Sequence, residues 1–100
     1  MIVSEIRVED AAEYMRLEED QYQRELLEAV LEAAKDYVSG YVGLPISSDT
    51  GDSLDQHKDI SLAVLALVQD MYDNRSMHVD KNNVNKTVES ILNMHRRNLL

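Results

Sequence analysis

LLEAVLEAAKDYVSGYVGLP, residues 26–45, is the most regular pattern in this 100-residue chain. Its apolar side chains recur every three or four residues, as they do on an amphipathic helix. The pattern extends back to residue 22 and forms two neighbouring seams: Tyr22, Leu26, Val30, Ala33, Tyr37 and Tyr41, and Leu27, Leu31, Ala34, Val38 and Val42. We therefore expect a helix over residues 21–42 that packs on two sides, either within the monomer or partly across a subunit interface.

Both ends of this helix carry recognisable signals. Asp20 can cap the start, and Gln23 follows three residues later, as in a capping box. Gly43 and Pro45 are expected to end it, because glycine suits the left-handed position after a helix and proline cannot continue one. The polar loop that follows, residues 43–54, does not have the ligand spacing of a calcium-binding EF-hand.

Three further segments have helical periodicity, and they are expected over residues 9–17, 55–74 and 86–96. Their inward residues are Val8, Ala11, Ala12 and Met15; Ile60, Val64, Leu67, Val68 and Met71; and Val88, Ile91, Leu92 and His95. The expected N-caps are Arg7 for the first of these helices, Ser53 or Asp55 for the second and Asn85 for the third, and Arg7 is a poor cap. Asn74 suits the C-terminal end of the second helix. Strict alternation is absent, so the sequence predicts an all-α bundle of about four helices in a single domain, residues 1–100.

The charge of the chain argues against nucleic-acid binding. Nineteen acids and ten bases give a net charge of −9, and residues 1–50 hold twelve acids against four bases. A protein that grips phosphates needs clustered lysine and arginine, whereas an acidic surface lets DNA slide past. The chain contains no cysteine, and its longest apolar run, LAVLALV at residues 62–68, is too short to span a membrane. These features predict a soluble protein that works inside a cell or in a particle assembled there.

Catalytic and cofactor motifs are missing from the sequence. His57, His78 and His95 fall on different segments without metal-ligand spacing, so we expect them to be solvent-facing or near helix caps. Three glycines cannot form a phosphate-binding loop, and no serine lies in a nucleophile elbow. We expect neither an enzyme nor a cofactor or metal site.

Four of the five tyrosines, Tyr22, Tyr37, Tyr41 and Tyr72, lie on or beside apolar seams. Such a ring can be buried at the edge of a core while its hydroxyl reaches water, or it can contact a partner protein. The sequence leaves both interpretations open.

Two motifs give the chain a family resemblance. AAKDYVSGYVGLP, residues 33–45, and MYDNR, residues 71–75, resemble the head-tail connector proteins of long-tailed phages and prophages, and the order of the remaining segments agrees over nearly the whole chain. The matching residues are Tyr37, Tyr41, Gly43, Pro45, Tyr72, Asp73, Asn74 and Arg75. Two positions depart from the family pattern: Arg7 replaces a capping Thr or Ser, and His95-Arg96 replaces a Tyr-Arg pair.

The resemblance implies a structural virion protein. Its copies, about twelve, would form a symmetric ring beneath the portal protein. Such a ring extends the DNA channel, helps to retain packaged DNA without sequence-specific binding, and docks the next connector, stopper or tail protein. The protein would be assembled in the host bacterial cytoplasm and would remain at the head-tail junction. In this interpretation, Arg75 would pair with a carboxylate of its own or a neighbouring subunit, or bond the last carbonyls of its helix.

The C-terminal end is the candidate partner interface, because it is locally basic: His95, Arg96, Arg97, Leu99 and Leu100. An acidic channel wall would let DNA pass without sticking.

The alternative function is an acidic DNA mimic that inhibits a DNA-binding enzyme, or a regulatory interaction protein. It would explain the net charge but not the two motifs.

Overall fold

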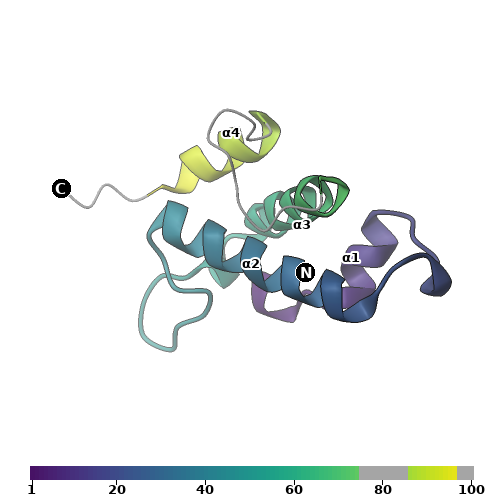
Figure 1. Cartoon of the computed structure of the whole chain (residues 1–100). Coiled ribbons are helices and arrows are strands. Elements are labelled where there is room, and N and C mark those ends of the chain that lie inside the picture. Colours follow the sequence, from purple (N-terminus) through teal and green to yellow (C-terminus); the bar gives the residue numbers. More distant parts are fainter. Residues whose placement is uncertain (75–85, 97–100) are drawn as a thin grey trace.

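The computed structural model describes residues 1–74 and 86–96 (Figure 1). Within these residues the chain is all-helical, without a strand, as predicted. The four α-helices are α1 (Val8–Tyr14), α2 (Arg24–Val42), α3 (Lys58–Asp73) and α4 (Lys86–His95). A short 3₁₀ helix precedes each of the first three α-helices. These are η1 (Val3–Glu5), η2 (Glu19–Gln21) and η3 (Leu54–Gln56).

Helix α2 is the longest of the four α-helices and contacts each of the other three. It packs along α3, while α1 lies against its N-terminal end and α4 covers α3 and the C-terminal end of α2 (Figure 1). The seam that α2 buries is the predicted one, Leu27, Leu31, Ala34, Val38 and Val42, together with Val30. Val30 belongs to the other predicted seam, and the remaining residues of that seam are only half-buried. They are Tyr22, just before the helix, and Leu26, Ala33, Tyr37 and Tyr41 on it. Thus one predicted side of α2 faces the core and the other lies at its edge.

The predicted cap of α2 at Asp20 is wrong. Residues 19–21 form η2 instead, and the backbone N–H of Glu18 donates to Gln21 Oε1 at 2.7 Å. Helix α2 therefore begins at Arg24, and its N-cap, Gln23, makes no side-chain capping bond.

The predicted caps of α3 are also wrong, because the segment around them forms η3. Ser53 precedes η3 without a side-chain capping bond, and α3 begins after His57. The carboxylate of Asp55 instead accepts two hydrogen bonds from Ser4, from its backbone N–H at 2.9 Å and its hydroxyl at 2.6 Å. Asp55 therefore ties η3 to η1, 51 residues away in sequence.

The predicted ends of α2 and α3 are confirmed. Gly43 follows α2 with a φ of 82°, and its N–H donates to the Ser39 carbonyl at 2.9 Å. Asn74 follows α3, and both its N–H and its side-chain amide donate to the Asp70 carbonyl, at 3.2 and 2.8 Å. The N-cap of α1 is Arg7, as predicted, without a side-chain capping bond; Asp10 accepts from the Arg7 backbone N–H at 2.9 Å. The predicted cap of α4, Asn85, lies outside the described residues.

The turn after α1 places an arginine where glycine is usual. Arg16 has a φ of 58°, a left-handed conformation that costs a residue with a Cβ about 1 kcal/mol. The turn is a Schellman motif, because the N–H of Leu17 donates to the Ala12 carbonyl (2.9 Å) and that of Arg16 to the Glu13 carbonyl (3.0 Å).

Arg16→Gly is expected to raise the free energy of unfolding by about 0.5–1 kcal/mol, because glycine removes the Cβ strain but also adds entropy to the unfolded chain. Urea denaturation measures the change. Arg16→Ala is the matched control: it also removes the guanidinium group but keeps the Cβ, so it should not stabilise. Equal stabilisation by both variants would place the cause in the arginine side chain rather than in the backbone.

A buried lysine attaches the N-terminal segment to α2. Lys35 is only 7% exposed, and its Nζ donates to the backbone carbonyl of Ile6 at 2.9 Å. Its aliphatic stem packs where a hydrophobic residue would otherwise fit. The hydrogen bond holds the residue that joins η1 to α1.

Lys35→Met keeps most of the stem and removes the donor, which leaves the buried Ile6 carbonyl without this partner. We expect a loss of about 1–2 kcal/mol in the free energy of unfolding. Lys58→Met, at an exposed lysine that begins α3, should change it by less than about 0.5 kcal/mol. Chemical denaturation of both variants tests this, and equal losses would contradict a specific role for the Ile6 contact.

Candidate assembly surfaces

A cluster of aromatic and polar side chains joins α2 to α4; we call it the tyrosine cluster: Tyr37, Tyr41, Asn93 and Arg96. The Tyr41 hydroxyl donates to Asn93 Oδ1 at 2.6 Å. The guanidinium carbon of Arg96 lies 4.9 Å from the centre of the Tyr41 ring, a cation–π distance. The ring of Tyr37 lies 6.0 Å from that of Tyr41, tilted by 31°. This cluster fixes the C-terminal end of α4 over the C-terminal end of α2.

Burial raises the pKa of the Tyr37 hydroxyl, and the neighbouring Tyr41 and Glu89 raise it further, while Arg96 opposes them. A raised pKa favours the neutral phenol in the folded chain. Its contribution to stability is therefore complete at neutral pH and is lost only as the pH rises through the folded-state pKa, above the ordinary tyrosine value of about 10.

A second cluster, which we call the histidine cluster, joins the loop after α2, the start of α3 and the end of α4. The rings of His57 and His95 lie 4.5 Å apart between centroids. Each Nε2 contacts a different aspartate: His57 contacts Asp52 Oδ1 at 3.0 Å, and His95 contacts Asp59 Oδ2 at 2.7 Å. The side chains of both histidines are largely buried, 25% and 18% exposed.

The expected position near helix caps is confirmed for this pair, because His57 is the N-cap of α3 and His95 is the last residue of α4, whereas the solvent-facing alternative is wrong. His57 and His95 are 38 residues apart in sequence, and only the packing of α4 against the start of α3 brings them together. Among the described residues, no group of three or more His, Cys, Asp or Glu side chains is arranged to hold a metal ion. His78 lies outside the described residues.

An acidic stripe runs along the exposed face of α2: Glu25, Glu28, Glu32 and Asp36. The spacing of three or four residues places the four carboxylates on one side of the helix. None of them forms an ion pair with a described residue. Like charges four residues apart destabilise a helix by about 0.2–0.5 kcal/mol per pair, so the stripe does not serve the stability of α2.

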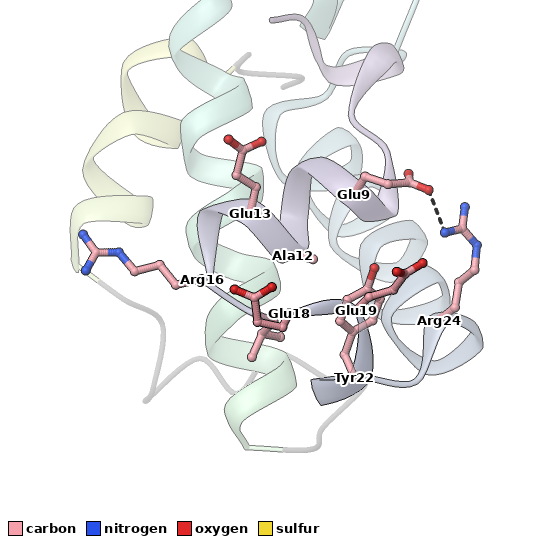
Figure 2. A pocket seen from close by; sticks show the side chains of 9 residues that line it. Glu9, Ala12, Glu13, Arg16, Glu18, Glu19, Tyr22 and Arg24 are labelled. Carbon is pink, nitrogen blue, oxygen red and sulfur yellow. Dashed lines mark ion pairs between the residues drawn. The ribbon is translucent and has the colours of Figure 1, made fainter.

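A hollow of about 410 Å³ lies at the opposite end of the molecule from the C-terminal end of α4, between α1 and the start of α2 (Figures 1 and 2). Ala12, Leu17 and Tyr22 supply its apolar lining, and Glu9, Glu13, Glu18, Glu19, Arg16 and Arg24 its charged lining. We call it the α1 hollow.

The charges around the α1 hollow are not balanced. Glu9 Oε1 pairs with Arg24 at 2.6 Å (Figure 2). A backbone hydrogen bond, and after it the Arg24 contact, lower the pKa of the Glu9 carboxyl. Figure 2 shows the Arg16 side chain pointing away from the glutamates. The remaining three glutamates therefore leave the hollow acidic.

The residues singled out by the family resemblance fall at three places. Tyr37 and Tyr41 belong to the tyrosine cluster, and Gly43 ends α2. The Pro45 carbonyl accepts from the Leu54 N–H at 2.9 Å, which closes the base of the loop. Tyr72, half-buried, and Asp73 form the last turn of α3, and Asn74 follows it.

The candidate partner interface is described only in part. His95 and Arg96 both contact residues of their own chain, in the histidine and tyrosine clusters. Arg75, Arg97, Leu99 and Leu100 lie outside the described residues. Nothing in the sequence indicated the contacts of Asn93 or Asp59, because both contacts depend on how α4 is placed.

Comparison with known protein families identifies the family of this chain. A family model described as the phage gp6-like head-tail connector protein matches residues 5–96. The chain belongs to this family. The match confirms the resemblance carried by the two tyrosine-containing motifs. No curated protein and no solved structure matches the connector significantly.

Membership defines the class of this connector. The family is a structural component of phages rather than a known family of enzymes. It points to the virion, and it implies contact with other phage head and tail proteins. Among the described residues, the connector has no helix that is both long and apolar enough to cross a membrane.

Proposed function

We propose that the connector forms a ring beneath the portal of the filled head. There it extends the DNA channel, helps to retain the packaged genome and presents the docking surface for the next connector, stopper or tail protein. The family match over residues 5–96 carries this proposal. A closed symmetric ring of about twelve copies is expected. It is assembled in the bacterial cytoplasm and stays at the head-tail junction.

The acidic stripe of α2 is the surface that we assign to the channel wall. Between residues 25 and 42 the only base is Lys35, which is buried, so the exposed face of the helix is acidic from Glu25 to Asp36. A ring multiplies this charge by the number of copies. The resulting potential repels the phosphate backbone, and duplex DNA passes without sequence-specific binding.

The ring is tested by mixing the connector with the portal protein of the same phage. We expect negative-stain images to show rings on the portal, coaxial with it and open enough for duplex DNA. The connector alone is measured by light scattering over a wide concentration range. A connector that neither forms rings alone nor binds the portal would overturn the proposal.

The assignment of the channel wall is tested by reversing the charge of the stripe. Glu25→Lys, Glu28→Lys and Glu32→Lys together place a cluster of bases on this face, so preformed rings should bind duplex DNA at low salt, where wild-type rings bind none. Glu5→Lys, Asp49→Lys and Glu89→Lys make the same change in charge at exposed positions off α2 and form the matched control. Equal binding by both triple variants would show that net charge, rather than the stripe, governs DNA passage.

A DNA-mimic inhibitor is the second candidate, and the net charge of −9 favours it. Titration of the connector against DNA-binding nucleases distinguishes the two functions. A mimic inhibits at stoichiometric concentration, whereas a connector inhibits none of them.

A further inference from the structure

We propose that neighbouring connectors join head to tail, with the C-terminal segment of one copy, residues 97–100, seated in the α1 hollow of the next. This inference rests on the ring of the proposed function and names the contact that builds it. The segment reads Arg-Asn-Leu-Leu, directly after Arg96.

The chemistry of the α1 hollow fits this occupant. Its apolar lining consists of Ala12, which is buried, and Leu17 and Tyr22, which are half-buried. Such a surface accepts leucine side chains. Glu13, Glu18 and Glu19 form no ion pair with a described residue and attract a basic group, because opposite charges across an interface steer association and fix its register. One arginine followed by two leucines supplies both kinds of contact.

The segment cannot reach the α1 hollow of its own chain. Arg96 lies over Tyr41, and the hollow begins at Tyr22 and Arg24. Tyr41 and Arg24 are 17 residues apart on one straight helix, which is about 26 Å at the α-helical rise. Four residues span at most about 14 Å when fully extended. The occupant of the hollow therefore comes from a second copy.

The positions of the two surfaces determine the kind of assembly. Figure 1 places the end of α4 and helix α1 at opposite ends of α2, and the α1 hollow is lined by residues of α1 and the start of α2. A contact between two different surfaces of the same protein is heterologous, and it closes into a ring when the rotation between copies divides a full turn. The contacts of Arg96 in the tyrosine cluster fix where the segment leaves the body, which gives each step around the ring a defined direction.

Two variants separate the two halves of this contact. Arg97→Glu alters the segment, and Glu13→Lys with Glu19→Lys alters the α1 hollow at two exposed positions. Each is expected to raise the concentration needed for ring assembly at least tenfold, as native mass spectrometry or mass photometry will show. Glu28→Lys with Glu32→Lys makes the same change in net charge on the α2 stripe and should leave assembly unchanged. Circular dichroism checks that all variants are folded.

Mixing the two defective variants gives a stricter test. In an equimolar mixture the native segment of one variant meets the native α1 hollow of the other, and the Arg97→Glu segment meets the hollow that carries Glu13→Lys and Glu19→Lys. Opposite charges then face each other at both contacts, so the mixture should form alternating rings although neither variant forms them alone. Combining all three substitutions in one chain should restore rings for the same reason. Failure of both the mixture and the combined variant to form rings would overturn the inference.

The remaining outcomes distinguish this inference from the proposed function. If wild-type chains form no ring even with portal present, the proposed function fails. If wild type and both defective variants form rings equally well, the ring stands and the head-to-tail contact is wrong. If Arg97→Glu forms normal rings that no longer bind portal, the segment faces the portal protein, which also refutes docking in the α1 hollow.

Discussion

Leu67→Ala is expected to lower the free energy of unfolding by about 3 kcal/mol, within the range of 2–5 kcal/mol found for buried leucines. Leu67 is 1% exposed and lies on α3, which, like α2, contacts each of the other three α-helices. Truncation removes apolar surface from the core and leaves a cavity that surrounding helices can fill only in part. Urea denaturation of the monomer at low concentration measures the loss.

Leu62→Ala is the matched control, because it makes the same substitution on the same helix. Leu62 is 49% exposed, so its truncation should change the free energy of unfolding by less than about 0.5 kcal/mol. The difference between the two variants tests the orientation of α3 rather than its helix propensity. Similar losses would mean that α3 is rotated about its axis relative to the core described here.

The sequence predicted the helices well where one continuous pattern determines them. The buried seam of α2 repeats over sixteen positions, from Leu27 to Val42, and Gly43 ends it with a positive φ that few other residues adopt. Such signals are local, and tertiary contacts do not compete with them. The same holds for Asn74, whose side chain reaches only to the preceding turn.

Helix starts were predicted less well, because capping side chains can be used elsewhere. Asp55 was a reasonable cap for α3, but its carboxylate accepts two hydrogen bonds from Ser4 instead. A sequence containing many acids offers several caps for each helix, and long-range contacts decide among them. Asp20 failed because a 3₁₀ turn intervenes before α2.

The candidate surfaces needed the placement of α4. His57 contacts His95, which is 38 residues away in sequence, and Tyr41 contacts Asn93, which is 52 residues away. No spacing rule connects them. For Tyr37 and Tyr41 the structure supports the core-edge interpretation within the chain, since both are half-buried and Tyr41 contacts α4 directly. Tyr22 has a different setting, because it lines the α1 hollow.

Leu92→Ala is expected to detach α4 from the rest of the protein. Leu92 is 1% exposed and, with Val88, forms the fully buried apolar side of the helix. Its truncation should cost about 2–4 kcal/mol of the interaction that holds α4 in place. An isolated helix of fewer than about 12 residues is marginal in water, so α4, which has ten, should unfold once it is released.

Hydrogen exchange distinguishes this local opening from global unfolding. In Leu92→Ala, the amides of α4 should lose protection well before those of α2 and α3, because the contacts between α2 and α3 remain when α4 is released. Met94→Ala, on the same helix but 75% exposed, should leave the exchange of α4 unchanged. Equal loss of protection throughout α2, α3 and α4 would contradict separate opening and make α4 part of one cooperative core. That result would also mean that α4 cannot leave the tyrosine and histidine clusters unless the whole chain unfolds.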